Sequence, residues 1–348
     1  MTDRRLNRRA ALAGLAASTA TVAALPARAG ILTDAIVAAA NKEAAIVFHT
    51  SIELGLCEKM IAAFNKPYPG IRVQLERTGA ERILQRINQE YSSGIYAADV
   101  VESSDTGMFV DWKKRGWLAR YVPDDTAAWP ADEKDPDGRF AAVRASLSVL
   151  GYNTRQVKPE DAPKGFADLL NPKWRMRLVK AHPSYSGSIY TATYATIQAM
   201  GWDYMEKLAK QRVMQVQSAT EPPKKVAVGE RSVSVDGTEY VLLALQEAGS
   251  PVAPIYATEG SPIFSGMCAV MEKAAHPNAA RVFQSFLFSL PCQQVMSDVG
   301  FLRSFHPGVR ENPARKPLSE IKLLRSDADS LAAAAEEIKK RYATVFGV

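Results

Sequence analysis

Hydrophobic positions along the chain repeat with two periods, one typical of strands and one typical of helices. Residues 45–49 form a short apolar run, the pattern of a buried strand. Ile83, Leu84 and Ile87 recur at three- and four-residue spacing, which predicts a helix with one buried face. We expect strands at 45–49, 71–75, 98–101, 146–152, 177–181, 232–235 and 264–271. Helices are expected at 53–65, 81–91, 108–117, 187–200, 202–211, 238–248 and 331–346, with a surface loop at 123–136.

This alternation of strands and helices predicts an α/β protein with a largely parallel sheet. In such sheets ligands bind beyond the carboxyl ends of the strands, where helix amino ends converge. Four loops after expected strands are rich in hydroxyl or acidic side chains, a composition that suits hydrogen bonds to a polar solute. The candidate binding residues are Thr50, Ser51, Ser103, Ser104, Ser184, Ser186, Gly187, Ser188, Thr238, Glu239 and Tyr240.

The first 29 residues have the pattern of an export signal. A start with four arginines precedes an uncharged, alanine-rich stretch at 10–25, and Ala27-Arg28-Ala29 fits a signal-peptidase site with cleavage after Ala29. The pair Arg8-Arg9 resembles a twin-arginine signal, but the usual Ser or Thr before the pair and Phe after it are missing. Both the twin-arginine and the general secretory route therefore stay open.

Length and charge narrow the classes of function. The chain has 348 residues, enough for two lobes that each have a core. Its 43 basic and 37 acidic residues include five arginines and one aspartate in the signal, which leaves a net charge of about +2 afterwards. Basic residues are spread along the chain, so we expect no nucleic-acid partner. Three cysteines, Cys57, Cys268 and Cys292, are too few for a disulfide framework, and we expect buried, unpaired thiols.

Motifs of common enzyme classes are absent from the sequence. It has no glycine-rich phosphate loop, dinucleotide fingerprint, Cys-x-x-Cys or Gly-x-Ser-x-Gly, and its four histidines are scattered. We therefore expect no catalysis, no bound metal and no cofactor. One alternative is a secreted hydrolase that uses Ser186 with His182. Another is a secreted interaction module, which would expose an apolar patch instead of a polar cleft.

Several segments resemble, in the same order, extracellular solute-binding proteins of the family that includes the ferric-ion-binding receptors. The segments are Leu-Gly-Tyr-Asn-Thr at 150–154, Leu-Leu-Asn-Pro-Lys-Trp at 169–174, His-Pro-Ser-Tyr-Ser-Gly-Ser at 182–188 and His-Pro-Asn-Ala-Ala at 276–280. The resemblance implies a type II periplasmic binding fold with a ligand cleft between two lobes. Lobe 1 would comprise residues 30–145 and 255–348, and lobe 2 residues 146–254. It also implies a periplasmic, monomeric receptor that closes about a hinge and delivers its solute to an ABC permease and its ATPase.

The expected ligand departs from the ferric receptors of that family. Where their His and Glu ligands are expected stand Ile52 and Ser104, and Glu239-Tyr240 replaces their tyrosine pair. We expect an oxyanion-bearing organic solute, phosphorylated, phosphonate or carboxylate, because a helix that begins near 184–188 would offer it free N–H groups. Glu239 would pair with a solute amine, or cap its own helix as part of Asp236-x-x-Glu239. Ferric iron, alone or with an anion, stays as the alternative ligand.

Overall fold

The computed structural model describes residues 32–313 and 315–348. The predicted export signal lies outside these residues. Within them, no helix combines the length and the apolar character that crossing a bilayer requires. Cys57, Cys268 and Cys292 are all buried and unpaired, as expected.

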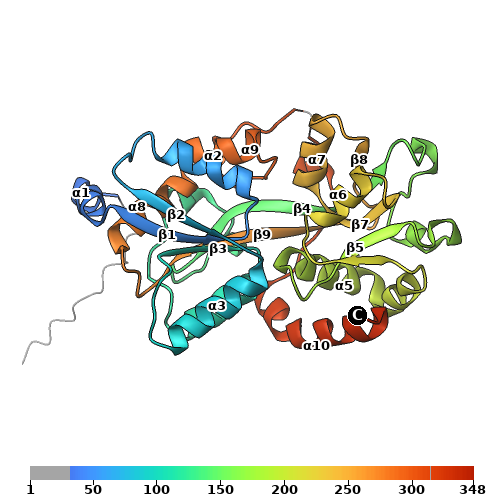
Figure 1. The fold of residues 1–348 in the computed structure, drawn as a ribbon, viewed down its shortest axis with the longest axis horizontal. Coiled ribbons are helices and arrows are strands. Elements are labelled where there is room, and N and C mark those ends of the chain that lie inside the picture. Colours follow the sequence, from blue (N-terminus) through green and yellow to red (C-terminus); the bar gives the residue numbers. More distant parts are fainter. Residues whose placement is uncertain (1–31, 314) are drawn as a thin grey trace, which may run out of the picture.

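Two long antiparallel strands run through the middle of the molecule and join its two halves (Figure 1). They are β4 (Ala141–Asn153) and β9 (Ser261–Val270), which pair from Ala141 opposite Cys268 to Leu147 opposite Ile263. The strand order is β2-β1-β3-β9-β4-β7-β5-β6, with β8 beside β4 and β10 (Leu323–Leu324) beside β9. Because β4 and β9 belong to both halves, they are the natural axis for relative motion of the halves.

Lobe 1 is the half of the molecule on the β3 side of β9. Its parallel strands β1, β2 and β3 end at Thr50, Arg77 and Ser103, so these three residues lie along one edge. Glu43, the last residue of α1, accepts hydrogen bonds from the backbone N–H groups of Asn278 and Ala279 at 3.0 and 2.7 Å, which closes the lobe around its late helices. The elements of lobe 1 are α1 (Asp34–Glu43), β1 (Ala45–Thr50), α2 (Leu54–Phe64), β2 (Arg72–Arg77), α3 (Ala80–Ser92), β3 (Val100–Ser103), α4 (Thr106–Lys114), α8 (Pro277–Phe288) and α9 (Leu290–Asp298).

Lobe 2 is the half on the β7 side of β4. Its central strand β7 pairs in parallel with β5 and antiparallel with β4. The helices predicted at 187–200 and 202–211 are confirmed as two helical segments of α5, separated by Gly201, whose backbone is non-helical with φ 77° and ψ 168°. The elements of lobe 2 are β5 (Leu178–Ala181), α5 (Gly187–Ala209), β6 (Met214–Val216), α6 (Glu221–Ala227), β7 (Val233–Thr238), α7 (Glu239–Glu247) and β8 (Val252–Ile255).

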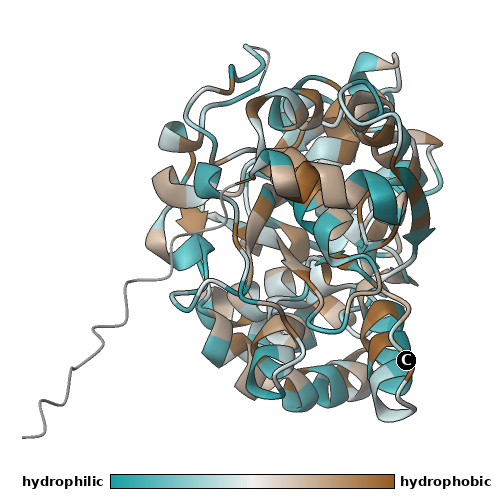
Figure 2. Ribbon diagram, turned by 90° about the vertical axis from the view of Figure 1, so that its left-hand side faces the viewer, coloured by the Kyte–Doolittle hydropathy of each residue, from teal (hydrophilic) through white to brown (hydrophobic). Residues whose placement is uncertain are grey.

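The last helix, α10 (Ala328–Phe346), touches both lobes. It packs against α4 and α5, and its Leu331 and Ile338 belong to the core of lobe 2. Alternating hydrophobic and hydrophilic bands mark it as amphipathic in Figure 2, where the label C lies beside it. The predicted division assigned residues 255–348 wholly to lobe 1. In the structure, α10, which belongs to that segment, lies at the interface between the lobes. The boundaries between the lobes stay a prediction.

The loop expected at 123–136 is more ordered than its composition indicated. It contains short 3-10 turns at Asp124–Ala128 and Ala131–Glu133. Between them Trp129 is buried, and its indole Nε1 donates to the carbonyl of Ala142 at 2.8 Å. The indole therefore ties this loop to strand β4.

Candidate ligand cleft between the lobes

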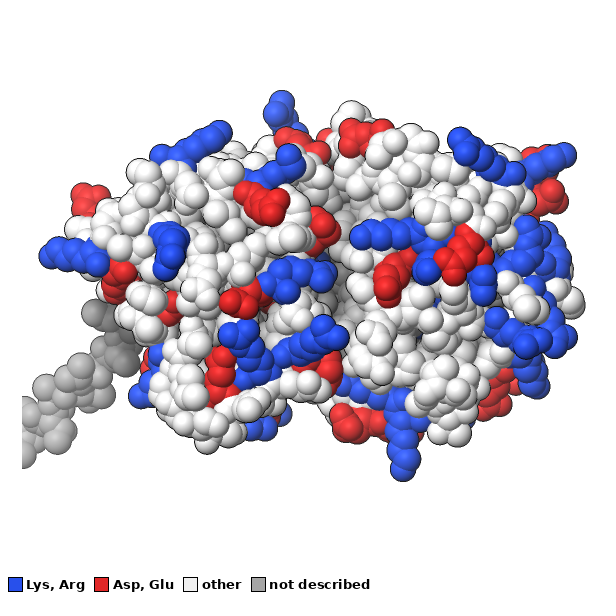
Figure 3. Space-filling model, viewed as in Figure 1, with Lys and Arg blue, Asp and Glu red and all other residues white. Residues whose placement is uncertain are grey.

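A cavity of about 300 Å³ lies between the lobes, beyond the carboxyl ends of their parallel strands. In the space-filling view a hollow runs between the two halves, with Lys and Arg side chains on its edges (Figure 3). Lobe 1 and strand β4 line the cavity with Ser51, Arg77, Gly79, Ala80, Glu81, Arg82, Gln85, Ser104 and Arg144. Lobe 2 lines it with Tyr185, Ser186, Ser188, Gln217, Ser218, Ala219, Thr220 and Tyr240, and Phe264 of β9 completes it.

Three arginines make the lobe 1 wall positive. Arg77 ends strand β2, and its Nε donates to the carbonyl of Ile52 at 3.1 Å. Arg82 lies in the first turn of α3, and Arg144 reaches the cavity from β4. Arg77 and Arg82 are exposed, whereas Arg144 is 4% exposed. The wall therefore combines two exposed guanidinium groups with one that is buried.

A buried carboxylate behind this wall holds the third arginine. Glu102 on β3 is 0% exposed, and its Oε1 accepts a hydrogen bond from Arg144 Nε at 2.9 Å. Its Oε2 accepts from Thr50 Oγ1 at 2.7 Å and from the backbone N–H of Ser51 at 3.0 Å. One carboxylate thus connects the ends of β1 and β3 with β4.

The lobe 2 wall is built from uncharged side chains. Ser186 caps α5, where its Oγ accepts from the N–H of Ile189 at 3.4 Å and lies 3.0 Å from Ser188 Oγ. The amino end of α5 therefore lies at the cavity, with the partial positive charge of a helix start. Ser218 Oγ and Thr220 Oγ1 lie 3.1 Å apart in the loop before α6. Hydroxyl and amide groups of this kind suit an uncharged, polar part of a ligand.

The lobes touch beside the cavity. A Cβ atom on Gly187 would lie 2.7 Å from the backbone N of Asp105 and 2.8 Å from its Cα, so only glycine fits there without movement. Close by, Lys339 Nζ of α10 lies 3.3 Å from Glu81 Oε2 of α3. The structure therefore shows the two lobes in contact across the mouth of the cleft.

The structure brings some of the predicted site residues together and leaves others behind the walls. Ser51, Ser104, Ser186, Ser188 and Tyr240 line the cavity. Ser184 and Gly187 line a small crevice at the contact between the lobes. Three further predicted residues, Thr50, Ser103 and Thr238, are buried at 0%, 0% and 1% exposure. Thr50 binds Glu102, Ser103 Oγ accepts from the N–H of Asp105 at 3.3 Å, and Thr238 Oγ1 donates to the carbonyl of Ala219 at 3.4 Å.

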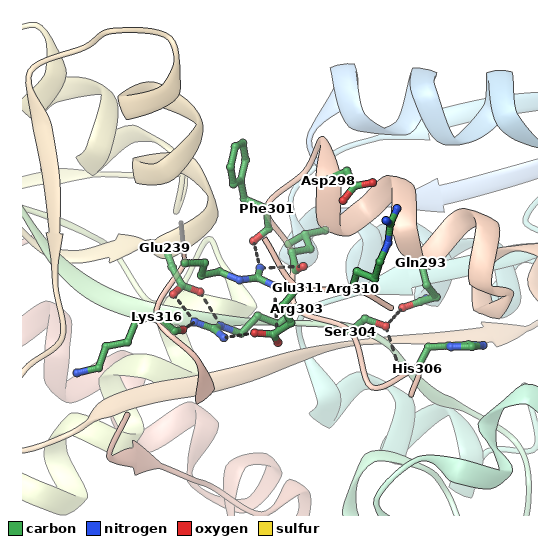
Figure 4. A network of polar contacts seen from close by, with 12 residues as sticks. Glu239, Gln293, Asp298, Phe301, Arg303, Ser304, His306, Arg310, Glu311 and Lys316 are labelled. Carbon is green, nitrogen blue, oxygen red and sulfur yellow. Dashed lines mark hydrogen bonds and ion pairs between the residues drawn. The ribbon is translucent and has the colours of Figure 1, made fainter. Parts of the chain in front are cut away.

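The position of Glu239 corrects the expectation that it pairs with a solute amine. Its side chain is 0% exposed and does not line the cavity, because Arg303 binds both of its oxygens at 2.9 and 2.7 Å (Figure 4). Tyr256 donates a further hydrogen bond at 2.7 Å. The capping box expected at 236–239 is not formed either, because Thr238 is the cap residue of α7 and makes no side-chain cap bond.

Arg303 itself belongs to the connection between the lobes. Its backbone N–H and C=O bond to Ala145 of β4 at 2.9 and 2.8 Å, and its side chain donates to the carbonyl of Lys316 at 2.8 Å (Figure 4). Glu311 lies 3.8 Å from the same guanidinium group. Through Arg303, Glu239 therefore ties the start of α7 to strand β4.

Several cavity residues escaped the sequence analysis. Arg77 and Arg82 both follow the strand expected at 71–75, so the rule applied to the other strands would have found them; in the structure Arg77 is the last residue of that strand, β2. Gln217, Ser218 and Thr220 follow β6, whose three residues were too few to detect by periodicity. Arg144 lies at the start of β4, before the strand expected at 146–152.

Ser186 and His182, the residues that the hydrolase alternative would use, bond to other groups and not to each other in the described part of the chain. Ser186 Oγ bonds to Ser188 and Ile189, whereas His182 Nδ1 accepts from the N–H of Ser184 at 3.1 Å. Burial is the first cause that lowers the pKa of His182, and the Lys180 charge adds to it. Across the described ranges, no cluster of three or more His, Cys, Asp or Glu side chains could hold a metal ion.

Residues 97–329 match the family of bacterial extracellular solute-binding proteins. A periplasmic binding protein from Actinobacillus pleuropneumoniae, with fructose 6-phosphate bound, has a TM-score of 0.79 and 21% identity, over 87% of this chain and 98% of that one. An iron-bound protein from Pseudomonas aeruginosa has a TM-score of 0.74 and 21% identity, over 86% and 99%. The Fe(3+)-binding periplasmic protein of Serratia marcescens is 22% identical over 315 residues, 84% of this chain and 88% of that protein. These likenesses confirm the predicted two-lobed, type II periplasmic binding fold.

Proposed function

Because this chain belongs to the bacterial extracellular solute-binding proteins, we propose that it is the periplasmic receptor of an ABC importer for an oxyanion-bearing organic solute. The observation that carries the choice of solute is the placement of Arg77, Arg82 and Arg144 on one wall of the cleft. Guanidinium groups bind phosphate, phosphonate and carboxylate oxygens through paired, charge-assisted hydrogen bonds. The proposed receptor binds its solute and releases it unchanged.

Two helix amino ends add to this preference for anions. Helix α3 begins at the cavity after Gly79 and has no side-chain cap, so its first N–H groups are free to bind a ligand. Helix α5 begins on the opposite wall. The charge of Glu81, in the first turn of α3, is offset by Lys339. Net positive charge therefore dominates the lobe 1 side of the cleft.

The rest of the solute would lie against lobe 2. Ser186, Ser188, Gln217, Ser218 and Thr220 offer hydroxyl and amide groups that suit a hydroxylated, uncharged body. A phosphorylated sugar combines both features, and the Actinobacillus pleuropneumoniae relative was solved with one. A phosphonate or a hydroxylated carboxylate has the same two-part chemistry.

Binding would proceed by closure about β4 and β9. The anionic group first engages the arginines of lobe 1, and the body of the solute then gains the contacts of lobe 2 only when the lobes meet. Since the closed form has contacts that the open form lacks, the solute shifts the population toward it. A monomer would then present the closed form to a membrane permease driven by its ATPase.

A thermal-shift screen of the chain from Gly30 onward tests this function. It covers phosphorylated sugars, phosphonates, carboxylates, polyamines, and ferric ion with and without citrate. A ligand at 100 times its Kd adds about 2.7 kcal/mol to the stability of the native state, so the melting temperature rises. We expect a rise with organic oxyanions and a smaller one after Arg77→Gln. A rise with ferric ion alone would overturn the proposal and favour an iron receptor.

A further inference from the structure

The structure assigns Glu102 as the positioning residue of the cleft, the group that aims Arg144 at the anionic end of the solute. This inference rests on the proposed function. Glu102 does not line the cavity, and it acts through Arg144, which does. Glu102 directly follows the strand expected at 98–101, but it is not among the candidate binding residues, because a single acidic residue at the end of a strand has no distinctive spacing.

The geometry around Glu102 fixes the direction of the arginine. Arg144 Nε and Nη2 lie 2.9 and 2.8 Å from the same oxygen, Oε1 of Glu102, and Nη2 also donates to Ser51 Oγ at 3.2 Å. Within the described residues, Nη1 is therefore the nitrogen of Arg144 without a protein partner. With Nε and Nη2 held from behind, Nη1 is available to an oxygen of the solute in the cavity that Arg144 lines.

The same carboxylate orients Ser51. The other oxygen of Glu102, Oε2, accepts from the backbone N–H of Ser51 at 3.0 Å and lies 3.2 Å from Ser51 Oγ. Thr50 Oγ1 donates to that oxygen at 2.7 Å. Ser51 is thus held at both its backbone and its hydroxyl group, and Glu102 has no free oxygen for any other role.

The three arginines differ in whether a carboxylate neutralises their charge. Glu102 and Arg144 form a buried pair whose charges cancel, so Arg144 contributes a directed hydrogen bond more than long-range attraction. Arg77 and Arg82 form no ion pair with the carboxylates in the described part of the chain, so they supply the attraction. Without Glu102, the Arg144 guanidinium would keep its charge but lose its fixed direction.

A double-mutant cycle tests this role, with inorganic phosphate as the probe in calorimetric titrations of the chain from Gly30 onward. We expect Glu102→Gln and Arg144→Gln each to weaken phosphate binding about tenfold. The double variant should bind no more than about twofold more weakly than Arg144→Gln alone, because Glu102 acts through Arg144. Glu133→Gln is the matched control, since Glu133 is another buried carboxylate of lobe 1 that lies outside this cavity and accepts from Ser265. It should leave phosphate affinity unchanged.

Other outcomes separate this inference from the function on which it rests. If the effects of the two substitutions multiply, or if Glu102→Gln does not weaken binding, Glu102 is a structural residue and the inference is overturned. If the wild-type chain binds no phosphate, the assignment of Arg144 to a phosphate group is overturned, whereas the thermal-shift screen decides the proposed function by itself. If the Glu102→Gln variant does not fold, the double variant Glu102→Gln, Arg144→Gln still tests the role of Glu102, because it removes both buried charges together. The phosphate affinity of the double variant must then equal that of Arg144→Gln, and a different affinity overturns the inference.

Discussion

Each lobe contains a buried ion pair, and the two pairs differ in where the cation lies relative to the cleft. In lobe 1, Glu102 lies behind the wall and its partner Arg144 reaches the cavity. In lobe 2, Lys180 and Asp236 are 2% and 4% exposed, and neither lines that cavity. Asp236 also accepts from the N–H of Ala181 at 3.1 Å, so the pair joins β5 to β7. The position of the cation therefore decides whether such a pair serves binding or holds a lobe together.

The walls also differ in net charge. The exposed guanidinium groups lie on lobe 1, and lobe 2 offers hydroxyl and amide groups. Capture of an anion would then depend on lobe 1, whereas discrimination among anions would depend on the contacts that form when lobe 2 closes. Substitutions on the lobe 1 wall should therefore change the affinity for anions in general, whereas substitutions on the lobe 2 wall should change the selectivity among anions.

The largest effect is expected from the lobe 2 pair. Lys180→Met leaves the Asp236 carboxylate buried without its partner, which should lower the free energy of unfolding by about 3–5 kcal/mol. Urea denaturation measures this loss. The double variant Lys180→Met, Asp236→Leu should recover part of it, since no unpaired charge stays buried. Loss of solute affinity without loss of stability would show that this pair serves binding, and would remove the contrast between the lobes.

The next effect is expected on lobe 1. Arg77→Gln removes a charge-assisted bond of about 1.5–3 kcal/mol, so anion affinity should fall roughly 10- to 100-fold. The affinity of the variant should also depend less on salt, because one attracting charge is gone. Titration calorimetry at two salt concentrations checks both. Arg72→Gln, at the other end of the same strand, is the control and should change neither.

A third substitution tests the contact between the lobes. The Cβ atom of Gly187→Ala would collide with the backbone of Asp105, so the lobes must stay apart. We expect affinity to fall roughly tenfold, about 1.4 kcal/mol, with unchanged stability of the unliganded protein. Small-angle scattering with saturating solute should show a more open molecule. Gly55→Ala, where the added Cβ meets only the Glu53 side chain, should behave like wild type. Full closure of the Gly187→Ala variant would contradict the role of this contact.

The smallest effect concerns one histidine in each lobe. Burial is the main cause that lowers the pKa of His49 in lobe 1 and of His182 in lobe 2. Each side chain therefore takes up a proton less readily in the folded protein than in the unfolded chain, whose histidines take up protons below a pH of about 6.5. The free energy of unfolding should therefore fall as the pH drops below that value.

Urea titrations between pH 5 and pH 8 compare the two histidines. His49 is 0% exposed, and its ring nitrogens have no hydrogen-bond partner among the residues that the structure describes, so His49→Phe should flatten the pH dependence more than His182→Phe does. A steeper pH dependence in His49→Phe would contradict this assignment.

Much of the fold could be predicted because its long elements bury regular faces. Ile83 and Ile87 of α3 are both 0% exposed, as their spacing indicated. Strands β6, β8 and β10 have three, four and two residues, too few to show a period. The candidate site was harder to predict, because a polar residue after a strand looks the same whether it faces the cavity or the interior. Ser104 faces the cavity, whereas Glu239 faces Arg303, which lies 64 positions later.

The hydrogen bonds from Asn278 and Ala279 to Glu43 have a consequence for biosynthesis. They join residues that are 235 and 236 positions apart in the sequence. Strand β3 likewise pairs with β9, which is made much later in the chain. A ribosome that has not yet passed residue 298 therefore carries a lobe 1 without its last two helices, however complete lobe 2 is. Native pairing over such distances is slow, because the loop between the partners must close first. Lobe 1 can therefore complete its native fold only after the chain has been made as far as residue 298, so it should be the later of the two lobes to become resistant to protease during synthesis.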